Sequence, residues 1–259
     1  MNAVVGNARV LRHSFGCAFA DYAMMFMWRT WSTAYLGRMI MQVLFFGIIG
    51  LLLGDPAAIQ YLIIGNAIVV AAFESVNAVN STTWERRAGT LSLLVVLAGR
   101  SVQWIPTGIA LSTISLVVVA QIFGVPLPWP RSLLVPVLVA TISLSAFIWR
   151  LLYGTLVFRA IEQRSYATML SYLAFMAFCG VNVPVEFWPA WIQRAVAFLP
   201  VTHGLQAIRL LIDGGAASEI VRLAGLELAV AGLWLIPAVL AIRRLVDGGR
   251  KRGTIDFST

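Results

Sequence analysis

The sequence predicts an all-α integral membrane protein with six transmembrane helices, and three observations support this fold class. The 259-residue chain is 60% hydrophobic and 12% charged, with a mean hydropathy of +0.86. Soluble domains are usually about 45–50% apolar and about 25% charged, so a single soluble core would leave much apolar surface in water. The apolar residues also form long runs, as helical spans of roughly 20 residues require.

Six apolar runs are the predicted spans of one transmembrane domain, which we assign to residues 1–259. Each run is apolar on all sides and lacks the alternation of a barrel strand. This favours helices, in which no backbone group is left unpaired in lipid. The runs cover residues 36–53, 57–78, 102–124, 132–153, 165–180 and 223–242, of which the fifth is short.

The basic residues predict that both ends of the chain, including the tail 243–259, are cytoplasmic. Cytoplasmic loops of membrane proteins are enriched in Lys and Arg. With the N-terminus inside, 15 of the 19 basic residues fall in inner segments. The four in outer segments are Arg131, Arg194, Arg209 and Arg222. The net charge of +8 therefore reflects membrane topology, and we expect membrane lipids, not nucleic acid, as partners.

Residues 1–35 precede the first span and predict an amphipathic helix in the inner membrane interface. Phe15, Phe19, Tyr22 and Phe26 recur at helical spacing, and tryptophans that favour the headgroup level follow them. The alternative is that this stretch is a loose extension of the first span.

Residues 181–214, called the 181–214 segment below, predict short helices that dip into the outer leaflet. The segment is apolar but interrupted by prolines. Helices beginning near Pro189 and after Pro200 fit best, because proline is tolerated in a first helical turn. His203 has no second His or Cys nearby, which favours a packing or capping role over metal binding. The other residues of interest are Pro184, Glu186 and Arg209.

The inner loop 79–101 contains a candidate docking element. Its stretch Trp84-Glu85-Arg86-Arg87-Ala88-Gly89-Thr90-Leu91 indicates a short helix, a turn at Gly89 and a second amphipathic piece. Such an element can enter a cleft on a soluble partner, with Glu85 and Arg86 setting the register through charge. The alternative is a solvated loop whose arginines only enforce the topology.

Charged residues lie within several of the predicted spans, where such groups are functional candidates by default. Glu74 is near the inner end of its span, so snorkelling or a partner arginine explains it equally well. Arg150, like Arg38, can reach the inner headgroups. Glu227 is expected to pair with Arg222 or with an arginine of the outer helices.

Two stretches resemble a known family. Glu85–Leu91 is similar to the Glu-Arg-x-x-Gly-Thr-Leu stretch of ABC type-2 permeases, the membrane subunits of many bacterial drug, glycolipid and polysaccharide exporters. Pro184–Pro189, followed by Leu199–His203 and Arg209, looks like that family's outer re-entrant region. Ser92 departs from the pattern, because many members carry an acidic residue there. The departure affects the expected detail of the ATPase contact and not the resemblance as a whole.

The resemblance implies ATP-driven export across a bacterial cytoplasmic membrane. Two permease subunits, identical or related, would pair and bind two cytoplasmic ATPase subunits that hold ATP and Mg. Trp84–Leu91 would be the coupling helix. The chain has no Gly-x-x-x-x-Gly-Lys-Ser/Thr stretch, so we expect no catalytic residue and no metal site in it, and the ATPase on a separate polypeptide.

The apolar spans favour a hydrophobic or amphipathic cargo, such as a drug in multidrug efflux, an antibiotic or a lipid-linked molecule. Export of a polysaccharide or glycolipid is the alternative. A polytopic membrane enzyme is disfavoured, because the spans contain no Gly-x-Ser-x-Gly, His-Glu-x-x-His or paired aspartates. An ion-coupled transporter or channel is disfavoured by the few ionisable groups in the spans.

Overall fold

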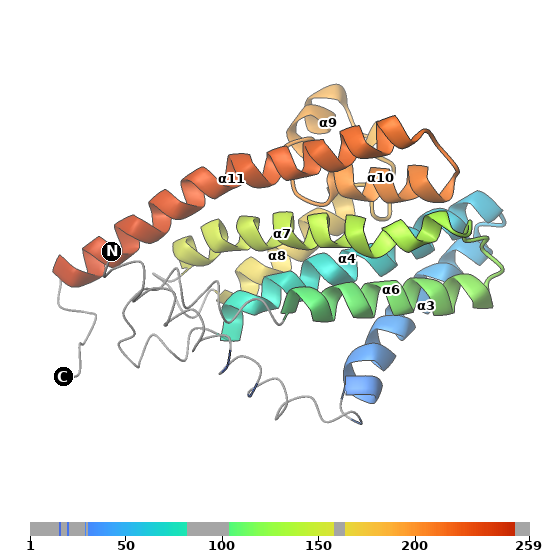
Figure 1. The fold of residues 1–259 in the computed structure, drawn as a ribbon, viewed down its shortest axis with the longest axis horizontal. Helices are drawn as coiled ribbons and strands as arrows, with labels where there is room; N and C mark the ends of the chain where they lie inside the picture. Colours follow the sequence, from blue (N-terminus) through green and yellow to red (C-terminus); the bar gives the residue numbers. More distant parts are fainter. Residues whose placement is uncertain are drawn as a thin grey trace.

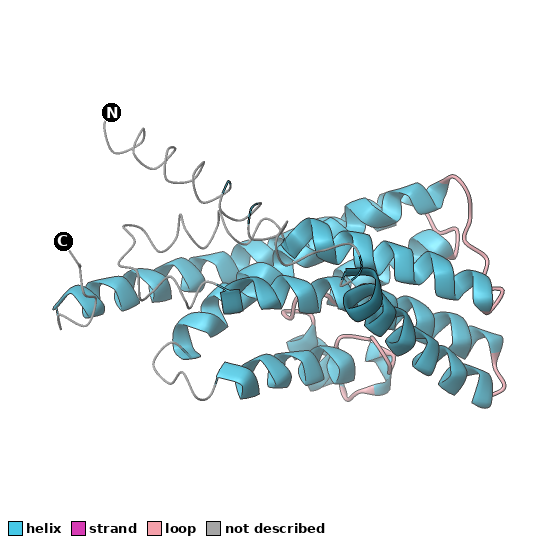
Figure 2. Cartoon of the chain, turned by 90° about the horizontal axis from the view of Figure 1, so that it is seen from below, coloured by secondary structure: helices cyan, strands magenta, loops and turns pink. Residues whose placement is uncertain are grey.

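The computed structural model describes residues 31–81, 104–157 and 164–251, together with Gly16, Ala20 and Arg29. Every regular element in these residues is a helix (Figure 2). The predicted coupling helix, Trp84–Leu91, and most of the predicted interfacial helix within residues 1–35 lie outside the described residues.

Within the described part of the chain, five helices are long and apolar enough to cross a membrane, so this is a multi-pass membrane protein. They correspond to the first, second, third, fourth and sixth predicted spans. A π-helical turn, η1, leads into the first, and a 3-10 turn, η3, leads into the fourth. The elements are η1 (Trp31–Leu36), α3 (Gly37–Leu52), α4 (Pro56–Ser81), α6 (Trp104–Ile122), η3 (Arg131–Leu134), α7 (Val135–Val157) and α11 (Ala217–Lys251).

The fifth predicted span corresponds to the short helix α8 (Arg164–Phe178). It has 15 residues and is strongly apolar only over Met169–Phe178. A helix of about 20 residues is needed to cross the hydrocarbon core. The structure therefore supports five of the six predicted spans, and a sixth crossing at α8 stays a prediction.

Two helix boundaries differ from the predicted ones. The first span begins at Trp31, because η1 continues into α3 without a break and packs Trp31 and Tyr35 against Met39. The end of the predicted interfacial helix is thus an extension of the span. α11 begins before residue 223 and runs through part of the predicted tail. Hydropathy marks only the apolar centre of this helix, whereas its polar ends are also compatible with helical structure.

α4 lies at the centre of the bundle. It packs against α3, α6 and α7, while α7 packs in turn against α11 (Figure 1). The side chains of Leu62, Ile63, Ile64, Asn66, Ala67, Ile68, Val69, Val70, Ala71 and Ala72 are all buried. A helix that is apolar all round suits a position surrounded by other helices, and the central place of α4 follows from that composition.

The 181–214 segment folds into η5 (Val185–Phe187), α9 (Ala190–Val196) and α10 (Thr202–Ile212). α9 begins directly after Pro189, and α10 begins two residues after Pro200, near the predicted starts. Figure 1 shows α10 running beside α11. The entry of these short helices into the outer leaflet stays a prediction.

Candidate functional site

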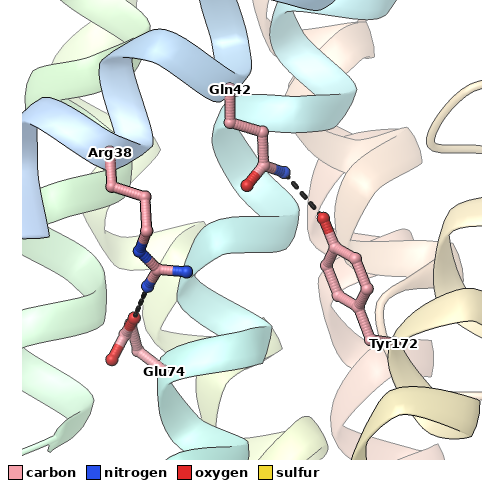
Figure 3. A network of polar contacts seen from close by, with 4 residues as sticks. All are labelled: Arg38, Gln42, Glu74 and Tyr172. Atoms are coloured by element: carbon pink, nitrogen blue, oxygen red, sulfur yellow. Dashed lines mark hydrogen bonds and ion pairs between the residues drawn. The ribbon is translucent and has the colours of Figure 1, made fainter.

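Polar side chains gather at two places on α4, one toward each end of the helix. The Arg38 cluster consists of Arg38, Gln42, Glu74 and Tyr172, from α3, α4 and α8 (Figure 3). The Arg209 cluster joins α4 to the 181–214 segment and the residues just before it. It consists of Tyr61, Gly65, Asn66, Gly180, Val181, Asn182 and Arg209.

In the Arg38 cluster, α3 is linked to α4 and to α8 by side chains one helical turn apart. Arg38 Nη2 lies 3.2 Å from Glu74 Oε1, and Gln42 Nε2 donates to Tyr172 Oη at 2.8 Å. The Tyr172 ring also meets Phe73 edge to face at 5.0 Å. Arg38 and Gln42 are four residues apart, so they lie on the same face of α3. The contact with Glu74 and the contact with Tyr172 are therefore both made from that face.

Glu74 is fully buried, whereas the Arg38 side chain is 51% exposed. A buried carboxylate is costly unless it is paired and hydrogen-bonded. Of the two explanations that the sequence left open for Glu74, the partner arginine is confirmed. In this pair, the Arg38 side chain is half-exposed and the Glu74 carboxylate lies inside the bundle.

Arg209 is the centre of the second cluster. Its guanidinium carbon lies 3.4 Å from the centroid of the Tyr61 ring, a close cation–π contact. Arg209 Nη2 donates to the backbone oxygens of Tyr61 and Val181, at 3.1 and 3.3 Å. Burial lowers the pKa of Arg209 to about 10, so the side chain stays charged at neutral pH.

The chain that follows α8 lies directly on α4 in this cluster. A Cβ atom on Gly65 would overlap the Val181 oxygen, so only glycine permits this approach. Tyr61 Oη donates to the Gly180 oxygen at 2.7 Å, and Asn66 Nδ2 donates to Asn182 Oδ1 at 2.9 Å. Gly180 has a φ of +79°, which glycine adopts readily and which turns the chain onto α4.

Glu227 of α11 holds the first turn of α10. Its two carboxylate oxygens accept hydrogen bonds from the Val201 and Gly204 amides, at 2.8 and 3.0 Å. The predicted pairing with Arg222 is wrong, because Arg222 pairs with Glu219 one turn away. Helix N-termini present unpaired amide donors, and a buried carboxylate beside them accepts from these. Val201 has a φ of 81°, rare for a β-branched residue, and the Glu227 contact helps to hold it there.

His203 has the local role that we expected. Its Nε2 donates to the Ala197 oxygen at 3.0 Å, across the turn between α9 and α10. Among the described residues, no group of three or more His, Cys, Asp or Glu side chains is placed to hold a metal ion.

The other predicted residues have simpler places. Pro184 and Pro189 directly precede η5 and α9, and the exposed Glu186 lies within η5. Pro200 is buried in the turn before α10. Arg150 is almost wholly buried on α7, so the expected snorkelling to the headgroups is wrong. The two carboxylates have different partners, since Glu74 pairs with Arg38 of α3 and Glu227 accepts from amides at the start of α10.

Several residues of both clusters were not predicted from the sequence, among them Gln42, Tyr61, Asn66 and Tyr172. Gln42 and Asn66 carried a usable signal, because each is an amide within a mainly apolar span. Their partners lie more than 100 positions away in the chain, so periodicity along one helix could not identify them.

Comparison with known proteins gives one result. The family model for ABC-2 type transporters matches residues 17–212. This range contains α3, α4, α6, α7, α8, α9 and α10, and with them both clusters and the Trp84–Leu91 stretch. A comparison with curated proteins and one with solved structures found no match.

Proposed function

We propose that this chain, which belongs to the ABC-2 type transporter family, is the membrane subunit of an ATP-driven exporter. In this proposal two such subunits pair and bind two cytoplasmic ATPase subunits, in a bacterial cytoplasmic membrane. The observation that carries the proposal is the family match. It spans most of the apolar bundle and the predicted coupling stretch in one continuous range.

The energy source in this proposal is ATP hydrolysis on the partner. Residues 82–103 connect α4 to α6, and they contain Glu85 and Arg86, which we propose contact the ATPase. α4 is the most enclosed of the candidate spans. A push on this connection would therefore act directly on the helix around which the others pack.

The cargo in this proposal is hydrophobic or amphipathic. An exposed stripe on α3 recurs every three or four residues, which puts it on one face of the helix. It carries the half-exposed Arg38 at one end and apolar side chains along the rest. The apolar members are Met41, Phe45, Ile48 and Leu52, and α8 exposes Met169, Leu170 and Leu173. We propose that the second subunit and the cargo pack against these faces.

Co-purification with the candidate ATPase tests the partner. We expect the detergent-solubilised wild type to retain the ATPase, and the Glu85→Ala/Arg86→Ala variant to lose it or its coupled ATP turnover. The matched control is Glu162→Ala/Arg164→Ala, which removes the same two charges from the other predicted inner loop and should keep the complex. If the wild type binds no ATPase, the exporter proposal is wrong and a channel or membrane enzyme takes its place.

Transport in inside-out vesicles tests direction and cargo. Export from a cell becomes uptake in such vesicles, so we expect ATP-dependent accumulation of ethidium or movement of an NBD-labelled phosphatidylethanolamine toward the lumenal leaflet. A complex that hydrolyses ATP and moves neither probe contradicts the hydrophobic cargo and favours polysaccharide export instead.

A further inference from the structure

Arg209 fixes the main chain at two places that are far apart in the sequence. Its acceptors, the oxygens of Tyr61 and Val181, both belong to the backbone. A side-chain partner can change its rotamer, but a backbone partner moves only with its helix or loop. Removing the buried cation from these oxygens would leave its charge in apolar surroundings, which is strongly unfavourable. The contact therefore resists separation.

Further contacts attach both ends of the 181–214 segment to α4. At its start, Asn182 accepts from Asn66, while the neighbouring Val181 packs against Gly65. At its end, Asp213 Oδ1 accepts from Gln60 Nε2 at 2.8 Å. Since these α4 residues lie within two helical turns, the segment is held against one short stretch of the helix.

The attachment lies toward one end of α4 and the predicted coupling loop lies at the other. α4 has 26 residues from Pro56 to Ser81, which at 1.5 Å per residue makes it about 39 Å long. The predicted loop 79–101 overlaps the last residues of α4, which ends at Ser81. A displacement of that end can reach the Arg209 cluster along a single helix.

We propose that Arg209 is a positioning residue for transport, which makes the 181–214 segment follow α4 when the ATPase moves it. The inference rests on the proposed function and adds to it the route by which movement crosses the protein. In the transport cycle, α4 and the segment stay joined and move as one unit.

Arg209→Lys tests the role of this residue. Lysine keeps the charge but lacks the planar group that stacks on Tyr61 and reaches two oxygens at once. In vesicles that contain the ATPase, we expect ATP hydrolysis within about twofold of the wild type and ATP-driven probe transport lower by roughly tenfold, in the usual range of coupling effects. A purely structural role would lower both, so the readout is the ratio of transport to hydrolysis. The control, Arg194→Lys on the exposed face of α9, should leave the ratio unchanged.

A cross-link tests whether the segment and α4 stay joined. Cysteines replace Gln60 and Asp213, which are in contact at the surface, and a reducible bifunctional thiol reagent links them. Cys17 is replaced by Ser, and the buried Cys179 is kept. We expect the link to leave transport intact with Arg209 present and to restore it in Arg209→Lys. A link that stops transport until it is reduced would show that the segment must leave α4, and would overturn the proposal.

Failure of the proposed function and failure of the role of Arg209 give different results in these experiments. If the wild type moves neither ethidium nor the labelled lipid with ATP, the proposed function is wrong and the role of Arg209 fails with it. If the wild type transports and Arg209→Lys keeps the same ratio of transport to hydrolysis, only the role of Arg209 is wrong.

Discussion

The Arg38 and Arg209 clusters each use an arginine from a neighbouring helix to contact α4, but the contacts differ in kind. Arg38 is half-exposed and meets a carboxylate, and its neighbour Gln42 meets a phenol. Arg209 is buried and meets two backbone oxygens and the face of an aromatic ring. The first cluster thus joins side chains to side chains, whereas most hydrogen bonds of the second run from a side chain to the main chain.

The contacts of the Arg38 cluster therefore allow the helices some movement, whereas those of the Arg209 cluster fix their positions. Side chains at the edge of a bundle can exchange partners through rotamer changes, and a half-exposed cation keeps part of its solvation. Buried bonds to backbone oxygens offer neither route. We therefore expect substitutions in and around the Arg209 cluster to cost more stability than substitutions in the Arg38 cluster, in the order given below.

The largest effect is expected for Gly65→Val, because its side chain would overlap the Val181 oxygen. Overpacking typically costs about 1–3 kcal/mol, and a clash with backbone belongs at or above the upper end. Thermal unfolding in detergent measures the effect. Gly225→Val on α11 is the control, since nothing lies within 4 Å of a Cβ there. Equal unfolding temperatures for the two variants would contradict the close approach at Gly65.

Glu227→Ala should be the next most costly, because it leaves two buried amides, of Val201 and Gly204, without an acceptor. Hydrogen bonds to charged groups contribute about 1.5–3 kcal/mol, and the strained backbone at Val201 loses its support. Glu219→Ala removes a carboxylate from the exposed pair on the same helix, where water screens the charges and little stability is lost. If both alanine variants unfold alike, Glu227 does not hold α10.

Asn66→Leu should have a smaller effect, because it removes one hydrogen bond between α4 and the 181–214 segment and replaces the amide with an apolar group of similar size. Side-chain hydrogen bonds in membrane proteins average about 0.6 kcal/mol, with a maximum of about 1.7 kcal/mol. A double-mutant cycle with Asn182→Leu isolates the pair. A coupling energy of zero would show that this bond does not help to hold the 181–214 segment on α4.

Gln42→Leu should have the smallest effect, below about 0.6 kcal/mol, since the Tyr172 hydroxyl at the edge of the bundle can find another partner. Leucine also suits α3, whose other residues after Arg38 are apolar. The same unfolding assay measures it. A loss as large as that of Glu227→Ala would reverse the comparison and show that the Arg38 cluster also fixes helix positions.

Much of the fold could be predicted from the sequence, since each span is a local property. The apolar runs at 57–78 and 102–124 became α4 and α6 with shifts of a few residues. The boundaries at Trp31 and Lys251 could not be predicted, because helical structure continues there beyond the apolar run. The prolines at 189 and 200 did indicate where the short helices begin, since proline limits the local backbone.

The candidate site was predicted as single residues without their partners. Glu74, Arg209 and Glu227 stood out because ionisable groups are rare in apolar stretches. Whether Glu227 meets an arginine or backbone amides depends on which helix end lies beside it, which no spacing along α11 reveals. The predicted roles of Glu85 and Arg86 fall outside the described residues and stay predictions.

The sequence by itself determined the helical membrane class, the places of five spanning helices and the residues that needed partners. The reason is the lipid, which requires every backbone group of a span to be bonded within its own helix. Such a helix appears in the sequence as one continuous apolar run. Only the tertiary structure decided that α4 is central, that Arg209 reaches the oxygens of Tyr61 and Val181, and that Gly65 must stay small. Those facts depend on which helices pack together, and packing between distant segments leaves no period in the sequence.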